Sequence, residues 1–275
     1  MKVLILNASP KRRGGASKFF SMLLRPFLPG CQVKTLPLRG PGDYNAALEA
    51  FGWAEAVVLS APLYVDGAPS HVLPFLEQAE TVCLEKKLDF KLYVLSNNGF
   101  VEGRQNELHL RLYEGWCRRS GATWGGGLGI GGGVMLNWLC MLLPLFFLLH
   151  TVEVITMAQR GTLTPLTALD CYSGSLFDLF FCAGLIWGLA LMGRRVRKGI
   201  CGVNRYTRVL MPSFLFLVGA DIFMLLSALF RGTLPHKLFR MENQLAWDGN
   251  VYRNAFGEVV GMMIPKKKDD NQQNK

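Results

Sequence analysis

A group of residues near the start of the chain has the hydroxyls, charges and backbone freedom needed to hold an anion. The group follows the short apolar run Lys2–Asn7 and consists of Ser9, Lys11, Arg12, Arg13, Gly14, Gly15 and Ser17. Serine hydroxyls, free backbone N–H groups and the positive end of a following helix together bind phosphate, and glycine lets the backbone close on such a ligand. We therefore expect an anion site in this loop, which lacks the GK[ST] triplet of a Walker loop.

The segments that must position this loop alternate between strands and helices over residues 1–133. Apolar runs typical of strands covered on both faces lie at 2–7, 32–36, 55–60, 90–96 and 122–130. Segments whose apolar residues recur at helical spacing lie at 17–28, 45–53, 70–82 and 105–120. This alternation predicts an α/β domain with a doubly wound parallel sheet. Such sheets bind ligands outside the carboxyl ends of their strands, where the Ser9–Ser17 loop is expected to lie.

The loop resembles the phosphate loop of flavodoxin-like NADPH-dependent FMN reductases and related NAD(P)H quinone oxidoreductases. That family typically has N-G-S-P-R-x-x-G-N-[ST]-[ST], and this chain has "LNASPKRRGGAS". The matching residues are Ser9, Pro10, Gly14 and Ser17. The departures from the pattern are Ala8, Lys11, Gly15 and Ala16, which stand for glycine, arginine, asparagine and a hydroxyl residue.

Two further motifs carry the same resemblance. "SAPLYVDGAPSHVLPFLEQ" (Ser60–Gln78) is similar to the family's segment after the third strand, with Pro74 where a lysine is usual, and it keeps Pro62, Tyr64, Pro69, Phe75 and Leu76. "SNNGFVEGRQNE" (Ser96–Glu107) follows the fourth predicted strand, where the family places a glycine-rich loop beside the flavin ring. The resemblance covers about residues 1–133, roughly half of the chain.

The resemblance implies a five-stranded parallel sheet in the order 2-1-3-4-5 with FMN at its carboxyl ends. The FMN phosphate would lie on the loop from Ser9 to Ser17, which includes Ala16. The ring would lie between two loops, which are Pro62, Leu63, Tyr64 and Val65 on one side and Asn97, Asn98, Gly99 and Phe100 on the other. The implied activity is hydride transfer from NAD(P)H through FMN to a small acceptor such as a quinone or free flavin, and it needs no acid–base side chain.

The remainder of the chain contains three apolar segments, at 134–149, 175–193 and 209–230. A bilayer core of ~30 Å needs about 20 helical residues, so we expect a membrane-associated helical region over 134–240 and a polar tail over 241–275. The segment Arg194–Arg208 carries six cations and is interpreted as a topology signal or a contact with lipid headgroups. Because the N-terminus does not read as a signal peptide, the N-terminal domain is expected in the cytoplasm. The number and topology of crossings stay open.

Composition and motif spacing argue against nucleic acid as a partner and against disulfide or zinc sites. The formal net charge is +10, but no arginine-rich helix with interleaved aromatics occurs, so nucleic acid is not an expected partner. Seven cysteines without a CxxC motif argue against a disulfide framework or a zinc site. "GLGIGG" (Gly127–Gly132) is interpreted as a close turn that lets the chain leave the sheet.

Two alternatives to the membrane-tethered reductase remain open at this stage. One is a non-enzymatic membrane-anchored scaffold or binding module whose altered phosphate loop binds nothing. The other is a soluble reductase whose apolar helices form a homodimer interface.

Overall fold

A computed structural model of the chain describes residues 1–11, 15–64, 67–230, 246–247, 251–253 and 259–262. Its centre is a six-stranded parallel sheet in the order β2-β1-β3-β4-β5-β6. The strands are β1 (Lys2–Asn7), β2 (Gln32–Pro37), β3 (Ala56–Pro62), β4 (Lys91–Asn97), β5 (Thr123–Ile130) and β6 (Arg205–Thr207). The first five have the flavodoxin-like order 2-1-3-4-5, so the predicted fold class is confirmed.

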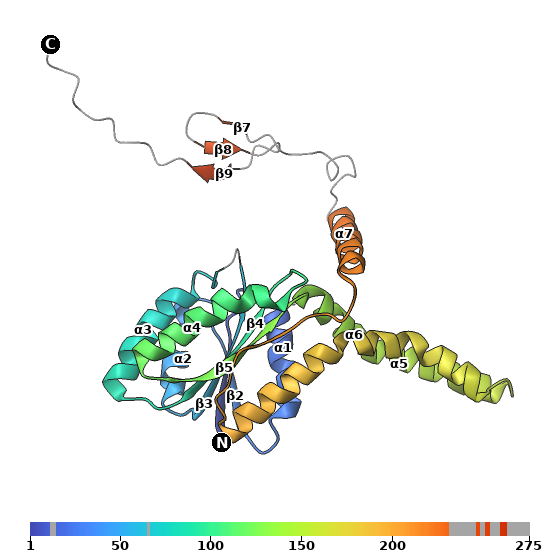
Figure 1. Cartoon of the computed structure of the whole chain (residues 1–275), viewed down its shortest axis with the longest axis horizontal. Helices are drawn as coiled ribbons and strands as arrows, with labels where there is room; N and C mark the ends of the chain where they lie inside the picture. The colour runs from blue at the N-terminus through green and yellow to red at the C-terminus, as the bar shows by residue number, and fades with distance from the viewer. Residues whose placement is uncertain (12–14, 65–66, 231–245, 248–250, 254–258, 263–275) are drawn as a thin grey trace, which may run out of the picture. The chain divides into compact units, whose positions relative to one another are not determined.

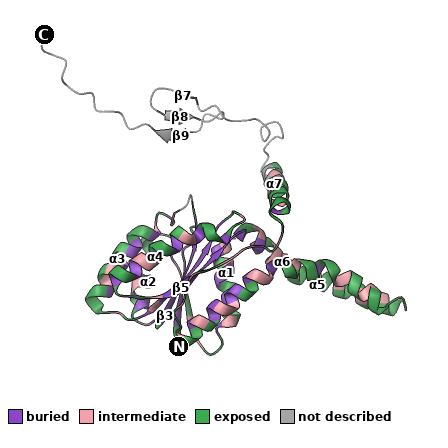
Figure 2. Cartoon of the chain, in the orientation of Figure 1, coloured by how far each residue is buried: buried purple, intermediate pink, exposed green. Residues whose placement is uncertain are grey.

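Helices cover both faces of the sheet (Figure 1). One face is covered by α2 (Tyr44–Phe51), α3 (Val72–Lys86) and α4 (Glu107–Ser120), and the other by α1 (Ala16–Leu24) and part of α6 (Pro165–Lys198). The strands alternate accordingly. Leu4, Leu6, Val57 and Leu59 join a core cluster with the first group of helices. Every residue of β3 is buried (Figure 2), as expected for a central strand between two helical layers. The described residues also form the short 3-10 helices η1 (Arg25–Phe27), η2 (Pro41–Asp43) and η3 (Gly103–Asn106).

The helix α5 (Gly133–Gln159) and the first half of α6 form an antiparallel pair that projects from this domain. We call residues 133–180 the hairpin. Its helices contact each other where Thr151 Oγ1 lies 2.9 Å from the Tyr172 hydroxyl and where the Phe147 and Tyr172 rings lie 5.9 Å apart. α5 continues through Pro144 to Gln159, so the helix is longer than the predicted apolar segment 134–149.

The second half of α6 packs on the sheet beside α1. Its buried side chains are Phe181, Cys182, Leu185, Leu189, Met192 and Val196, and glycines allow the close approach. A Cβ atom on Gly188 would lie 3.1 Å from Leu128, and one on Gly193 would lie 2.5 Å from the Phe27 side chain. The second apolar segment, 175–193, therefore belongs partly to the core of the α/β domain.

The segment Arg194–Arg208 is part of the α/β domain, and its interpretation as a topology signal or lipid contact stays a prediction. The end of α6 turns at Gly199, the Arg195 guanidinium donates to the Val203 carbonyl at 2.8 Å, and the chain then adds β6 to the sheet. The Tyr93 hydroxyl lies 3.3 Å from both the Arg195 and the Ile200 carbonyl oxygens. These contacts fasten the basic segment to the α/β domain.

The first compact unit extends past the expected boundary at residue 133 to Phe216, and the second covers 217–275. α7 (Ser213–Phe230) begins in the first unit and lies within the third apolar segment. The second unit contains β7 (Ala246–Trp247), β8 (Val251–Arg253) and β9 (Val259–Met262), which form an antiparallel sheet. The rest of the predicted tail, including 263–275, lies outside the described residues.

Candidate functional site

The loop between β1 and α1 presents an open helix start at the carboxyl edge of the sheet, the edge where its parallel strands end. Gly15 is the N-cap of α1 in extended conformation, the first turn holds no acid, and among the described residues no side chain caps it. Ser9 and Ser17 are buried, whereas Lys11 is exposed. A Cβ atom on Gly15 would lie 2.5 Å from Ser9 Oγ, so this glycine lets the Ser9 hydroxyl lie close to the start of α1. The geometry leaves N–H groups for an anion.

Buried hydroxyls tie this helix start to the ends of β3 and β4. Ser17 Oγ donates to Asn97 Oδ1 at 2.7 Å, and Ser60 Oγ donates to the Ser17 carbonyl at 2.8 Å. The Ala8 N–H donates to the Ser60 carbonyl at 2.8 Å. The Ser17 hydroxyl proton is therefore used in the hydrogen bond to Asn97, and the group of Ser17 that remains to donate to an anion is its backbone N–H. Ser60 is the first residue of the second motif, but its residue type and position in the sequence do not predict this role.

The loop after β3 starts at the same edge. Pro62 and Leu63 are buried, and the Leu63 N–H donates to the Asn97 carbonyl at 2.8 Å. Tyr64 is 41% exposed, and its backbone pairs with Gly67 at 3.0 and 2.9 Å. Burial of part of its ring raises the pKa of Tyr64 above the ordinary tyrosine value, so the phenol stays neutral at physiological pH. Its ring is available to a planar ligand.

The loop after β4 is held by Asn98. Asn98 Oδ1 accepts from the Phe100 N–H at 3.1 Å, and Asn98 Nδ2 donates to the Glu102 carbonyl at 3.1 Å. Gly99 has open space around its Cα, and Phe100 is 57% exposed. The structure thus brings Ser9, Gly15, Ala16, Ser17, Pro62, Leu63, Tyr64 and Asn97 through Phe100 to one edge of the sheet. The predicted site residues Arg12, Arg13, Gly14 and Val65 lie outside the described residues.

A buried polar network lies beneath the Asn97–Phe100 loop. Ser96 Oγ is 2.7 Å from both Asn106 Oδ1 and His109 Nδ1, and His109 Nε2 is 2.8 Å from the Tyr113 hydroxyl. Burial lowers the pKa of His109 to about 4, so the imidazole is neutral at physiological pH. Because Ser96 and His109 are shut off from solvent, they do not form a nucleophile and base. Their hydrogen bonds join the end of β4 to η3 and α4.

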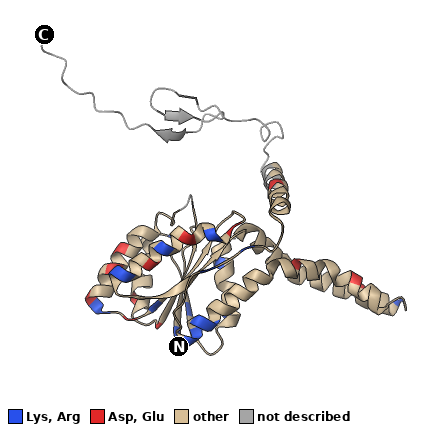
Figure 3. Cartoon of the chain, in the orientation of Figure 1, with Lys and Arg blue, Asp and Glu red and all other residues tan. Residues whose placement is uncertain are grey.

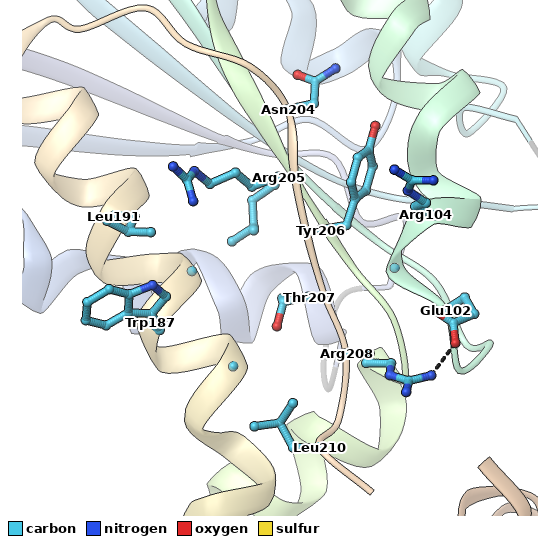
Figure 4. Close-up of a pocket in the computed structure, with 14 residues that line it drawn as sticks. Glu102, Arg104, Trp187, Leu191, Asn204, Arg205, Tyr206, Thr207, Arg208 and Leu210 are labelled. Atoms are coloured by element: carbon cyan, nitrogen blue, oxygen red, sulfur yellow. Dashed lines mark hydrogen bonds and ion pairs between the residues drawn. The ribbon is translucent and has the colours of Figure 1, made fainter. Parts of the chain in front are cut away.

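A groove of about 650 Å³ lies elsewhere, along the edge strand β6 (Figure 4). It is lined by Trp187 and Leu191 of α6 on one side and by an ion pair between Arg208 and Glu102 on the other. Its charged side chains are largely solvent-exposed, and burial raises the pKa of Tyr206, which also lines it. The carboxyl edge, with its convergent loops and open helix start, is therefore the stronger candidate for a cofactor site.

No protein-family model matches the chain, and no curated protein sequence matches it. The chain is similar to the solved structure of the Trp repressor binding protein from Bacillus subtilis, with 15% identity, a TM-score of 0.39 and coverage of 47% of this chain and 84% of that chain. It is also similar to an NADPH-quinone reductase from P. pentosaceus, with 16% identity, a TM-score of 0.40 and coverage of 64% and 95%.

A third similar structure is the NAD(P)H:quinone oxidoreductase from Methanothermobacter marburgensis, with 17% identity, a TM-score of 0.40 and coverage of 50% and 90%. The fold of the present chain is given by its own strand order and register.

Proposed function

We propose that the carboxyl edge of the sheet binds FMN and that the protein is a membrane-tethered oxidoreductase, which passes hydride from NAD(P)H to a small acceptor. The observation that carries the proposal is the uncapped start of α1, which buried hydrogen bonds from Ser17 and Ser60 fix against the ends of β3 and β4. A phosphate there would accept hydrogen bonds from the N–H groups of Ala16, Ser17 and Lys18 and lie at the positive end of the helix dipole.

The residues at the other two loops fit the ring. Tyr64 and Phe100 are partly exposed aromatic side chains on the loops that flank the proposed ring position, and the backbone there is fixed by the Leu63–Asn97 hydrogen bond. When bound, FMN supplies the hydride chemistry. The chain's own part is to hold the phosphate, orient the ring and present polar backbone groups to it.

The membrane tether is assigned to the hairpin. α5 and α6 are long and apolar enough to cross a membrane, by length and composition. None of the most apolar stretch of α5 is buried, against 39% of that of α6. An exposed helix that is apolar all round is stable in lipid and not in water. In this proposal the α/β domain stays on the cytoplasmic side, and the acceptor is a quinone or free flavin.

A specific observation also favours the non-enzymatic scaffold. Ala8 and Ala16 replace a glycine and a hydroxyl residue of the resembling pattern, and the Ser17 hydroxyl proton is already used by Asn97. The phosphate would then rest mainly on backbone N–H groups. One binding experiment separates the two functions.

The experiment is an FMN titration of the detergent-purified full chain, followed by absorbance between 300 and 550 nm after desalting. Ala16→Asp places a carboxylate in the first turn of α1, where it repels phosphate but suits the helix dipole. Ala46→Asp makes the same change in the exposed first turn of α2. We expect the wild type and Ala46→Asp to retain flavin and Ala16→Asp to bind at least about tenfold more weakly. Absence of retained flavin in the wild type would favour the scaffold.

A further inference from the structure

The hairpin leaves the domain from the same edge that carries the proposed FMN loops. β5 and β6 are parallel to the other strands, so their carboxyl ends lie at the carboxyl edge. β5 ends at Ile130 and α5 begins at Gly133, while β6 ends at Thr207 and α7 begins at Ser213. α6 returns toward the domain along the same side and ends at the opposite, amino edge. Both helices of the hairpin therefore meet the α/β domain at the carboxyl edge.

Short contacts join the hairpin to the Asn97–Phe100 loop. The Gly133 N–H donates to the Asn98 carbonyl at 2.8 Å, and the Gly132 N–H donates to the Phe100 carbonyl at 2.5 Å. A Cβ atom on Gly133 would lie 2.9 Å from the Asn98 carbonyl oxygen, so the two backbones are in close contact. The hairpin and the proposed ring-side loop thus form one packed junction.

The charges of the hairpin and of the end of α6 fit a domain that rests on lipid by its carboxyl edge. From Val134 to Leu149 the chain has no charged residue, and Figure 3 shows the hairpin almost free of Lys and Arg. The exposed apolar side chains include Trp138, Leu145, Leu148, Phe177 and Phe180. In contrast, Arg194, Arg197 and Lys198 lie at the end of α6, at the amino edge. Insertion of the hairpin would keep these three cations away from the bilayer.

We infer that the inserted hairpin sets the carboxyl edge of the sheet against the bilayer surface, so that the proposed FMN ring faces lipid and takes its acceptor from the bilayer. The acceptor class is a quinone-type ring on a hydrocarbon tail. This inference rests on the proposed function. The exposed aromatic side chains of Tyr64 and Phe100 suit the boundary between headgroups and acyl chains. The overall reaction balances. NAD(P)H gives up a hydride and becomes NAD(P)⁺, and the quinone gains the two electrons and the proton of that hydride together with one proton from water.

The orientation can be measured without any activity. Asp89 and Phe100 are exposed residues just before and just after β4, and a strand of this length spans about 20 Å. Each is replaced in turn by p-azidophenylalanine, coupled to a fluorophore, and the full chain is reconstituted into phosphatidylcholine vesicles with spin-labelled headgroups. We expect at least twofold stronger quenching at position 100 than at position 89. Equal quenching, stronger quenching at position 89, or a chain that stays off the vesicles as a dimer would overturn the inference.

The source of the acceptor is tested with two benzoquinones that share a ring, one with a decyl tail and one without. The FMN-loaded chain in vesicles is supplied with NADPH, and the initial rates are compared at equal total quinone. We expect the tailed ring to be reduced at least tenfold faster. Equal rates, or faster reduction of the tailless ring, would refute delivery from the bilayer while leaving the proposed function intact. Reduction of neither ring would refute the reductase, and the quenching result would still decide the orientation.

Discussion

A lysine placed on the hairpin should detach the protein from membranes. Leu148 is 60% exposed on α5, about midway along the projecting pair, and none of the most apolar stretch of that helix is buried. At the centre of a membrane helix a leucine favours insertion by about 0.3–0.6 kcal/mol, whereas a lysine costs about 2.5–3.5 kcal/mol. Leu148→Lys therefore disfavours insertion by roughly 3–4 kcal/mol, which lowers the vesicle partition coefficient on the order of 100- to 1,000-fold.

The assay is flotation of the full chain with phosphatidylcholine vesicles on a density gradient. Leu84→Lys is the matched control, because Leu84 is 54% exposed near the C-terminal end of α3 in the α/β domain, away from the carboxyl edge. We expect Leu84→Lys to float like the wild type and Leu148→Lys to remain at the bottom of the gradient. Light scattering of the unbound fraction then distinguishes a membrane tether from a homodimer interface. A wild type that does not float and becomes a monomer on Leu148→Lys would refute the membrane tether and show that the hairpin joins two copies.

Three further changes test the site and its support. Asn97→Ala removes the acceptor of the Ser17 hydroxyl and should lower the free energy of unfolding by about 1–2 kcal/mol, measured by urea denaturation, together with weaker FMN binding. The pKa of His109 is about 4 in the folded protein against 6.5 when unperturbed, so the unfolded state takes up a proton first as the pH falls. The free energy of unfolding should then fall by about 1.4 kcal/mol per pH unit between those values. A His109→Gln variant with the same slope would contradict this origin. A Cβ atom on Gly103 would collide with the Thr207 and Gly129 carbonyls, whereas Gly99 has open space; Gly103→Ala should cost roughly 3 kcal/mol of unfolding free energy and Gly99→Ala much less, by the same denaturation assay.

The central strands of the sheet were predictable because their local sequence marks them. β1, β3 and β4 are continuous apolar runs, since both of their faces are covered. The loop positions follow from the ends of those runs, so the hydroxyls and glycines at the carboxyl edge could be named in advance. β6 could not be found in this way. It is three residues long, Arg205–Thr207, and it lies in a segment dominated by cations, so neither length nor apolarity marks it as a strand.

Composition alone could not predict that one half of α6 packs in the core and the other half forms the hairpin. A helix that packs in a core and a helix that lies in lipid are both apolar, so composition does not separate them. The spacing does carry a signal. The buried positions Phe181, Leu185, Leu189, Met192 and Val196 recur every three or four residues along one stripe. The glycines on the same stretch mark where the helix approaches the sheet. The preceding half lacks such a continuous buried stripe.

The continuity of α6 gives the orientation its physical basis. One unbroken helix of 34 residues completes the core with its second half and forms the hairpin with its first half. A tilt of the hairpin relative to the sheet would require bending α6 or breaking its packing against α1 and β5, and the Gly132–Phe100 and Gly133–Asn98 hydrogen bonds fix α5 at the second point. A flexible linker would let the domain rotate freely above the bilayer. Two rigid attachments at one edge hold the carboxyl edge at a set distance from the lipid, so the quenching difference between positions 100 and 89 should persist when the vesicle composition is changed.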